Sequence, residues 1–149
     1  MTKSVILAYA AGVVDSDGCI YISKRNRKGP TSYQCRVAVG MMDKKVPIWF
    51  YKNFGGSLTD RICKGQYNRM YRWVISCQQS KKFLIKIKPY LIGKKDRAEL
   101  AIKLQDTLKQ TTKQPSEYML RYRSSLHERM RVLNLTGVNR LNHMSLKGA

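Results

Sequence analysis

The sequence predicts an α+β domain in which a four-stranded, mostly antiparallel sheet carries helices on one face. Residues 18–42 and 57–76 each contain two runs of alternating apolar and polar residues, the pattern of half-buried strands joined as hairpins. Stretches with apolar residues at helical spacing precede, separate and follow these hairpins. The resulting order is α-β-β-α-β-β-α with additional C-terminal helices, which indicates strands and helices sharing one core.

The composition restricts the class of protein. The chain has 149 residues, of which 43% are hydrophobic, so it can form a single folded domain. We expect its core over about 4–112 and a C-terminal helix and basic tail over about 113–149. The chain carries 29 Lys and Arg against 9 Asp and Glu, a formal charge of +20. This charge favours a polyanionic partner, nucleic acid first, with an anionic membrane surface as the alternative.

Neither a membrane span nor a secretion signal is predicted. No apolar run is long enough to cross a bilayer, and the N-terminus leads almost at once into the first expected helix. The four cysteines form no C-x-x-C pair and the two histidines lie far from them, which argues against zinc and against a disulfide framework. We therefore expect an intracellular protein with no membrane partner.

The first expected helix runs from Ser4, which can cap it, to about Asp15. Ala8, Gly12 and Ser16 are spaced four residues apart and therefore share one helix face. Small side chains on one face allow another backbone to come very close. The sequence therefore predicts that a second helix packs on this face.

The remaining elements follow in chain order. They are expected at 18–27 and 33–42 (first hairpin), 43–54 (helix), 57–64 and 70–76 (second hairpin), and 80–87, 94–112 and 116–133 (helices). Asp43 and Ser116 are suited to cap the helices that they begin. Asp60 falls on the apolar face of the second hairpin, which leaves that register open by one residue. The tail from Asn134 is basic and Asn-rich, and we expect it to be only partly ordered.

The stretch from Ala10 to Gly18 reads Ala-Ala-Gly-Val-Val-Asp-Ser-Asp-Gly. It resembles the signature of the LAGLIDADG homing endonucleases, with conservative departures at the first, fourth, fifth and seventh positions. The predicted element order is that of the LAGLIDADG core, so the resemblance covers roughly residues 4–112. It implies a site-specific double-strand DNA homing endonuclease, intron- or intein-associated, in a prokaryotic or archaeal cytoplasm or in an organelle.

The resemblance also implies the chemistry and leaves two alternatives. Such an enzyme hydrolyses phosphodiester bonds at a long, near-palindromic site with Mg²⁺ or Mn²⁺, and Ca²⁺ could occupy the site without supporting cleavage. One alternative is an RNA maturase, which would bind RNA and assist splicing of its host intron. The other is a catalytically inactive DNA-binding regulator.

By resemblance, Asp17 binds the metal ion and positions water, and Ser16 is the second expected ligand. Lys94 falls where the family has a basic residue near the scissile phosphate, and an assignment slip would move this role to Lys95. A solvated lysine at a helix start is the alternative for Lys94, and the helix dipole, which disfavours a cation at that end, strengthens this alternative. Asp43 follows the second strand, where the family often carries a polar group that orders water. An acidic residue departs from that pattern, and a helix cap is its alternative role.

Asp15 has two open interpretations, support of the helix end and a place in a dimer interface. A carboxylate at the C-terminal end of a helix opposes the helix dipole, and a divalent ion would offset the charge of this acidic turn.

The outward-facing strand residues form the expected DNA-binding face. Arg and Gln suit the major-groove edges of guanine and adenine, and that groove admits a two-stranded ribbon. A solvated sheet face is the alternative, but no acidic residues are interleaved among these positions. The expected contacts are Tyr21, Ser23, Arg25, Arg27, Gln34, Arg36, Thr59, Arg61 and Arg72, with Lys95 beside the active site.

Only one copy of the acidic motif is present in the sequence. A duplex has two strands to cut, and one acidic turn serves one of them. We therefore predict a C2 homodimer that packs through Ala8, Gly12 and Ser16 and brings two Asp17 carboxylates together.

Overall fold

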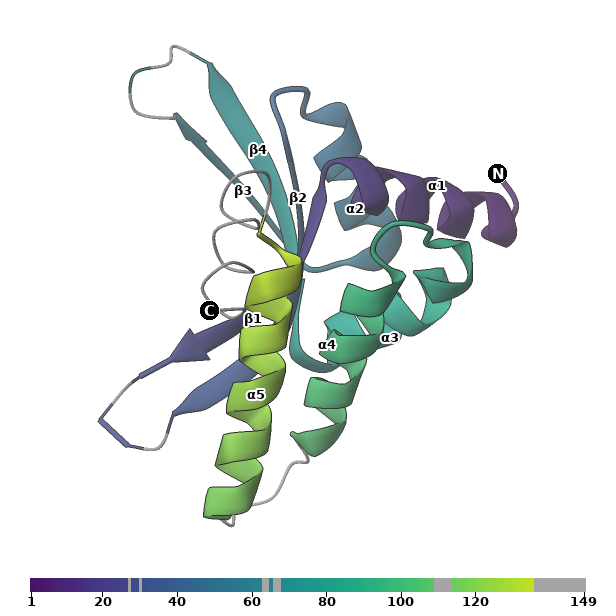
Figure 1. Ribbon diagram of the computed structural model, residues 1–149. Helices are drawn as coiled ribbons and strands as arrows, with labels where there is room; N and C mark the ends of the chain where they lie inside the picture. Colours follow the sequence, from purple (N-terminus) through teal and green to yellow (C-terminus); the bar gives the residue numbers. More distant parts are fainter. Residues whose placement is uncertain (27, 30, 63–64, 66–67, 109–113, 136–149) are drawn as a thin grey trace.

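The computed structural model describes residues 1–26, 28–29, 31–62, 65, 68–108 and 114–135. In chain order the elements are α1 (Lys3–Ser16), β1 (Gly18–Arg25), β2 (Ser32–Met41), α2 (Lys45–Phe54), β3 (Ser57–Ile62), β4 (Arg69–Ser76), α3 (Cys77–Ile87), the 3₁₀ turn η1 (Lys88–Tyr90), α4 (Lys95–Thr107) and α5 (Glu117–Leu133). The strands form one antiparallel sheet in the order β1-β2-β4-β3 (Figure 1). The predicted α+β class and element order are confirmed.

The register of the sheet separates a core face from an outer face. Ile20 pairs with Val37 and is buried with it against the helices. Tyr21 lies opposite Arg36 on the outer face, where both side chains are only partly buried. Because side chains alternate across a strand, this pairing places the apolar and basic residues of the two strands on opposite sides.

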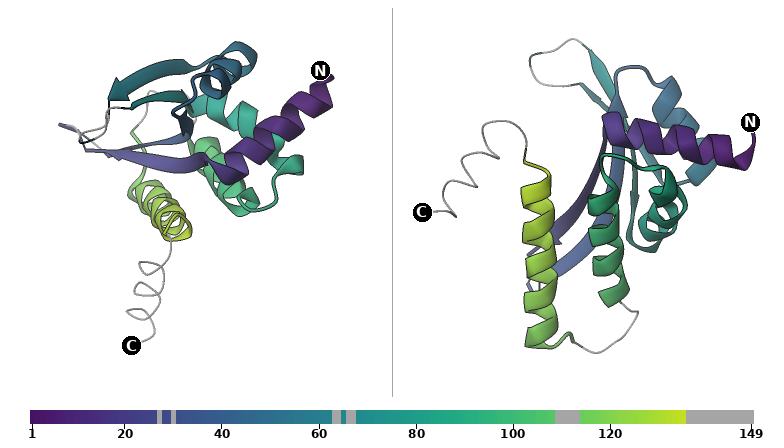
Figure 2. Two further views of the ribbon diagram at one scale, coloured as in Figure 1. Left: turned by 90° about the horizontal axis from the view of Figure 1, so that it is seen from above. Right: turned by 45° about the vertical axis from the view of Figure 1, so that its right-hand side comes forward.

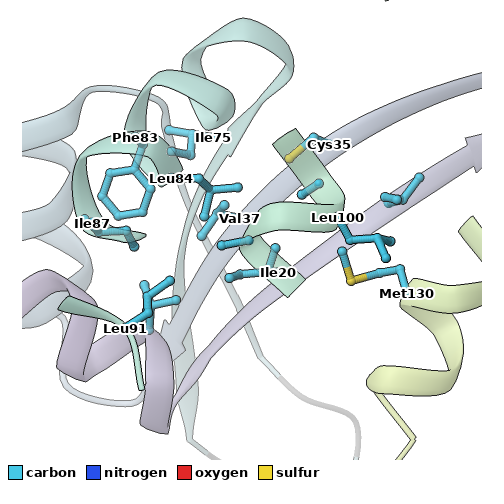
Figure 3. Close-up of a cluster of buried hydrophobic side chains, with 14 of the residues drawn as sticks. Ile20, Cys35, Val37, Ile75, Phe83, Leu84, Ile87, Leu91, Leu100 and Met130 are labelled. Carbon is cyan, nitrogen blue, oxygen red and sulfur yellow. The ribbon is translucent and has the colours of Figure 1, made fainter. Parts of the chain in front are cut away.

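The core lies between the sheet and all of the long helices behind it. Figure 3 shows Leu84 of α3, Leu100 of α4 and Met130 of α5 meeting Ile20 and Val37, and each of these five side chains is at most 5% exposed. Burial of one such side chain contributes about 1.5–3 kcal/mol. The C-terminal helix α5 is therefore part of the same core, beside α4 (Figure 2).

Three helix starts differ from the sequence prediction, α2 among them, because it begins at Lys45 with Lys44 rather than Asp43 as its N-cap. α1 begins before Ser4, with Thr2 at its N-cap, so Ser4 lies within the helix. α3 begins at Cys77, and the buried Ser80 hydroxyl lies 3.1 Å from the Cys35 carbonyl oxygen and 2.7 Å from that of Cys77. A serine can bond a backbone carbonyl inside a helix as readily as it caps one, and the sequence does not distinguish the two.

The two ends of the connection between α4 and α5 are fixed by side chains. The helix predicted over 94–112 is shorter in the structure, because α4 ends at Thr107, and residues 109–113 lie outside the described residues. Arg123 of α5 donates to Thr107 Oγ1 at 3.0 Å and to the Thr107 carbonyl. Ser116 caps α5 as predicted, accepting a hydrogen bond from the Met119 N–H at 3.2 Å.

The second hairpin has the register read from the alternation. Leu58 pairs with Trp73 and Asp60 with Tyr71, so Asp60 does lie on the side that faces the core. It is exposed because the core ends before the hairpin tip, and it forms an ion pair with Arg69. No helix in the described ranges is long and apolar enough to cross a membrane.

Candidate functional site

The acidic turn lies where α1 ends and β1 begins. Asp17 is the C-cap of α1, and its N–H donates to the Val13 carbonyl at 2.9 Å. Its carboxylate is exposed and accepts a hydrogen bond from the Ser16 hydroxyl at 2.9 Å. A Cβ at Gly18 would lie 2.6 Å from the Val14 Cα, so only glycine allows the turn to fold back so closely on the helix. The turn therefore presents one oriented carboxylate to solvent.

Asp15 points the other way, into the fold. Its carboxylate accepts three hydrogen bonds from successive backbone N–H groups, those of Ile92 at 2.7 Å, Gly93 at 3.3 Å and Lys94 at 2.9 Å. These residues lead into α4. Of the two open interpretations of Asp15, the structure supports a role in holding the fold around the end of α1.

The Lys94 side chain reaches the acidic turn from the other side. Its ammonium donates to the Val14 carbonyl at 2.8 Å and to the Gly18 carbonyl at 2.7 Å. Lys94 is the N-cap of α4, but its charge lies at the C-terminal end of α1, where the helix dipole favours a cation. The alternative of a solvated lysine therefore does not describe it, whereas Lys95 is exposed.

Burial lowers the pKa of Lys94, and the nearby Arg97 guanidinium lowers it further. The carboxylates of Asp15 and Asp17 act in the opposite direction. A lysine of lowered pKa beside an exposed carboxylate is typical of sites that do acid–base or electrostatic chemistry, although ion-pair networks also produce such shifts.

Arg97 is a residue of the site that the sequence did not indicate. It donates to the Gly93 carbonyl at 3.2 Å, to Asn134 Oδ1 at 2.9 Å and to the Leu133 carbonyl. Asn134 in turn donates to the Ile20 carbonyl at 2.9 Å. The network ties the approach to α4 to the end of α5 and to β1. A single arginine in a helix that carries three basic and three acidic residues has no periodic signal that could have marked it.

The oxygen atoms at the turn are of the kind that a hard cation binds, but they are only some of the ligands that it needs. Asp17 and Ser16 offer oxygen atoms, and Mg²⁺ prefers oxygen ligands while keeping several waters. The described part of the chain holds no group of three His, Cys, Asp or Glu side chains that could enclose a metal ion. Asp17 is the exposed carboxylate of the turn, and the further ligands would be water, a phosphate or groups of a second chain.

Asp43 has a structural role at the start of α2. Its Oδ1 accepts a hydrogen bond from the Lys45 N–H at 2.9 Å, as a capping aspartate does, and its side chain is exposed. The N-cap residue of α2 is Lys44, so Asp43 holds the start of the helix from one residue before its cap, and ordering of water stays a prediction.

The outer face of the sheet carries the predicted basic residues in register. Tyr21 lies opposite Arg36, and Arg72 opposite Thr59. Arg72 Nη2 donates to the Tyr21 hydroxyl at 3.3 Å, across β2, where the small Ala38 and Gly40 leave room for its long side chain. The pair is therefore held in a defined position before any ligand binds.

Gln34 extends this arrangement along β2. With its amide oxygen turned toward Arg36, it accepts from Arg36 Nη2 at 2.5 Å and from Nε at 2.6 Å. Ser23 lies opposite Gln34, and Arg25 and Arg61 are exposed further out on the same face. Arg27 lies outside the described residues.

The acidic residues of the chain lie mostly away from the outer face of the sheet. Five of the nine acidic residues are on α4 and α5, behind the sheet. None of the ion pairs among the described residues involves Arg25, Arg36, Arg61 or Arg72. A face with one sign of charge and no internal partners attracts a polyanion.

The small-residue stripe of α1 faces solvent. Ala8, Gly12 and Ser16 are all exposed, and a Cβ built at Gly12 meets nothing within 4 Å. The neighbouring Val5 and Tyr9 side chains are 49% and 40% exposed. α1 extends outward from the body of the domain (Figure 2). The surface is therefore open for another chain.

No family model and no curated protein matches the sequence. Solved structures do match. The homing endonuclease I-CvuI in complex with its target is 20% identical with a TM-score of 0.74, over 91% of this chain and 85% of that chain. The archaeal intron-encoded homing endonuclease I-Vdi141I complexed with DNA is 16% identical with a TM-score of 0.76, over 95% and 93%. The LAGLIDADG homing endonuclease I-GzeII in complex with its DNA target is 18% identical with a TM-score of 0.66, over 81% of this chain and 43% of that chain.

Proposed function

Because this chain has the fold of the LAGLIDADG homing endonucleases, we propose that it is a site-specific endonuclease that hydrolyses phosphodiester bonds in double-stranded DNA. The observation that supports this most directly is the meeting of the exposed Asp17 turn with the Lys94 ammonium, which bonds Gly18 across a separation of 76 residues. An acid and a cation converge beside a basic sheet face. We further propose that the gene lies in an intron or an intein, as the resemblance implies.

The catalytic roles follow from the positions of the two side chains. Asp17, with Ser16 orienting it, would hold a divalent ion, Mg²⁺ or Mn²⁺, which offsets charge on the scissile phosphate when bound. Ca²⁺ would occupy the site without supporting cleavage. The similar enzyme I-CvuI has been solved with its target in 2 mM Ca and, with the I-CreI target, in 2 mM Mg, where the DNA is not cleaved.

Lys94 would stabilise the charge that develops on the phosphate. Its ammonium has three donor protons, and the carbonyls of Val14 and Gly18 use two of them. The third is free to bond a phosphate oxygen or the attacking water, which Asp43 would help to order. A preorganised donor in this position acts on the transition state without reorganisation.

The outer face of the sheet would bind the major groove. The contacts that we propose on this face are Tyr21, Ser23, Arg25, Gln34, Arg36, Thr59, Arg61 and Arg72. Arg27, outside the described residues, stays a contact proposed from the sequence, and Lys95 would contact the backbone beside the active site. The Arg72 side chain is already fixed by its hydrogen bond to the Tyr21 hydroxyl, so it loses less conformational freedom on binding than a mobile arginine would. Such side chains suit the recognition of bases. The exposed Arg25 and Arg61 suit phosphate contacts.

The active enzyme would be a C2 homodimer. One chain supplies one acidic turn, whereas cutting both strands needs two. The exposed stripe of Ala8, Gly12 and Ser16 would form the contact, and the 93% exposed Ile92, held beside the end of α1, would extend it. This chain matches 43% of the I-GzeII chain, which leaves room in that longer chain for a second unit of the same size.

The proposal is tested by incubating the protein with a randomised plasmid library and Mg²⁺, then sequencing the cut ends. We expect cuts at one family of near-palindromic sites, and the variant Asp17→Asn should bind these sites without cutting them. Specific binding without cleavage by the native chain would instead identify a regulator. Selective binding of an intron RNA, with no cleavage of any DNA, would identify a maturase.

A further inference from the structure

The two acidic residues of the motif have separate surroundings. Asp17 is exposed, whereas Asp15 spends both of its oxygens on backbone N–H groups. Oδ2 accepts from Ile92 and Gly93, and Oδ1 accepts from Lys94. These three bonds occupy most of the roughly four acceptor sites of the Asp15 carboxylate, so its clearest function is to hold the segment that donates them.

That segment positions the Lys94 side chain. Lys94 returns two hydrogen bonds from its ammonium to Val14 and Gly18, the residues that flank the acidic turn. A lysine side chain is a flexible four-carbon stem, so the place of its charge depends on where its backbone is fixed. The backbone N–H of the same residue is the one bonded to Asp15 Oδ1.

Little else fixes the approach to α4. The Ile92 side chain is 93% exposed and Gly93 has none, so neither packs in the core. Leu91 is buried before them, and Arg97 bonds the Gly93 carbonyl from the other side. The Lys94 side chain itself makes no cap for α4. Asp15 thus accepts the three backbone hydrogen bonds that join this segment to α1, beside the bond from the Lys94 ammonium to the Val14 carbonyl.

We propose that Asp15 is a positioning residue for Lys94: its carboxylate fixes the backbone of residues 92–94 so that the Lys94 ammonium is held at the Asp17 turn. The catalytic consequence rests on the proposed function, whereas the positioning itself does not. Substitution of Asp15 should therefore act on the chemical step through Lys94 and should leave the DNA-binding face unchanged.

The experiment compares Asp15→Asn, K94M and the double variant by single-turnover cleavage and by binding of the same target. Asn keeps the shape of Asp but replaces one acceptor oxygen with a donor, so at least one of the three N–H groups loses its partner. We expect Asp15→Asn to slow cleavage about 100-fold, the scale of a misplaced catalytic group, with Kd changed less than about threefold. In the K94M background the same substitution should cost less than about threefold, because the residue it positions is gone.

The matched control is Asp96→Asn. Asp96 is an exposed aspartate at the same end of α4 and accepts a hydrogen bond from the Arg97 N–H at 2.7 Å, but it does not join α4 to α1. Like Asp15→Asn, the substitution Asp96→Asn removes one negative charge near the N-terminal end of α4. We expect Asp96→Asn to leave the cleavage rate of each background, native and K94M, nearly unchanged.

Hydrogen exchange of the backbone amides tests the positioning without DNA. The N–H groups of residues 92–94 should exchange at least about tenfold faster in Asp15→Asn than in the native chain, and at native rates in Asp96→Asn. If the native chain cuts no DNA, the proposed function fails and this measurement still decides the role of Asp15. Unchanged exchange at 92–94 would overturn the positioning role.

Equal losses from Asp15→Asn in the native and K94M backgrounds would overturn the coupling to Lys94. If Asp15→Asn does not fold, Asp15→Glu replaces it, because Glu keeps both acceptor oxygens on a stem one methylene longer. We expect that variant to slow cleavage about tenfold in the native background and not in the K94M background. A loss of the same size in both would equally reject the proposal.

Discussion

Substitution of Gly12 by Leu separates the stability of one chain from the association of two. Nothing lies within 4 Å of a Cβ at this position, so the isolated chain has space for the new side chain. A glycine within a helix costs about 0.8–1 kcal/mol relative to good helix formers, so the monomer should become more stable by roughly that amount. In a homodimer packed through Ala8, Gly12 and Ser16, the same leucine would force the two helices apart.

Thermal unfolding and sedimentation measure the two effects independently. We expect Gly12→Leu to unfold at an equal or higher temperature than the native chain, to sediment as a single 17.2 kDa chain on target DNA, and to lose double-strand cleavage. Ser125→Leu, which adds a leucine at an exposed position of α5, controls for the added apolar surface. A Gly12→Leu protein that remains dimeric and cleaves both strands would refute the role of α1 as the dimer contact.

Three further predictions follow from the site. Lys94→Met should lower the cleavage rate about 100-fold, the scale of losing one preorganised charge, and Lys95→Met much less; the reverse order would move the role one residue along. Burial lowers the pKa of Lys94 from the 10.5 of an ordinary lysine, so its ammonium loses its proton at a lower pH. The cleavage rate should therefore begin to fall below pH 10.5 as the pH is raised. A rate that stays constant up to pH 10.5 would contradict this. Target binding should weaken steeply with salt, with a log–log slope near −9 for about 10 phosphate contacts, and a slope near zero would argue against a DNA-binding sheet.

The alternation of the strands predicted the sheet faces well, because burial on one side is imposed by the pleat itself. The register at Asp60 was the weakest point of that prediction, since an acid on the apolar side looked like a slip. The structure keeps the register and places Asp60 beyond the end of the core, paired with Arg69. The pattern of a strand does not tell how far the core behind it extends.

Within the site, local spacing identified the acidic turn and the exposed stripe of α1, and the fold that the motif implies is confirmed by the structural comparisons. The contacts between distant segments were beyond such reasoning. The Lys94 ammonium was expected at the unfavourable end of a helix dipole, whereas it lies at the favourable end of another helix. Arg97 and Asn134 were missed because hydrogen bonds to backbone carbonyls leave no periodic trace in a sequence.

The two carboxylates of the motif illustrate why residue type alone did not assign their roles. They are two residues apart at the end of one helix, and successive positions there rotate by about 100°, so Asp15 and Asp17 face different directions. Asp15 is the last aspartate with helical geometry and faces the approach to α4, where three N–H groups need an acceptor. Asp17 is the cap, released from the helix and facing solvent. In the roles that we propose, the inner carboxylate brings Lys94 to the turn and the outer one binds the metal ion, so a single short motif would supply both the anchor and the ligand of one catalytic centre.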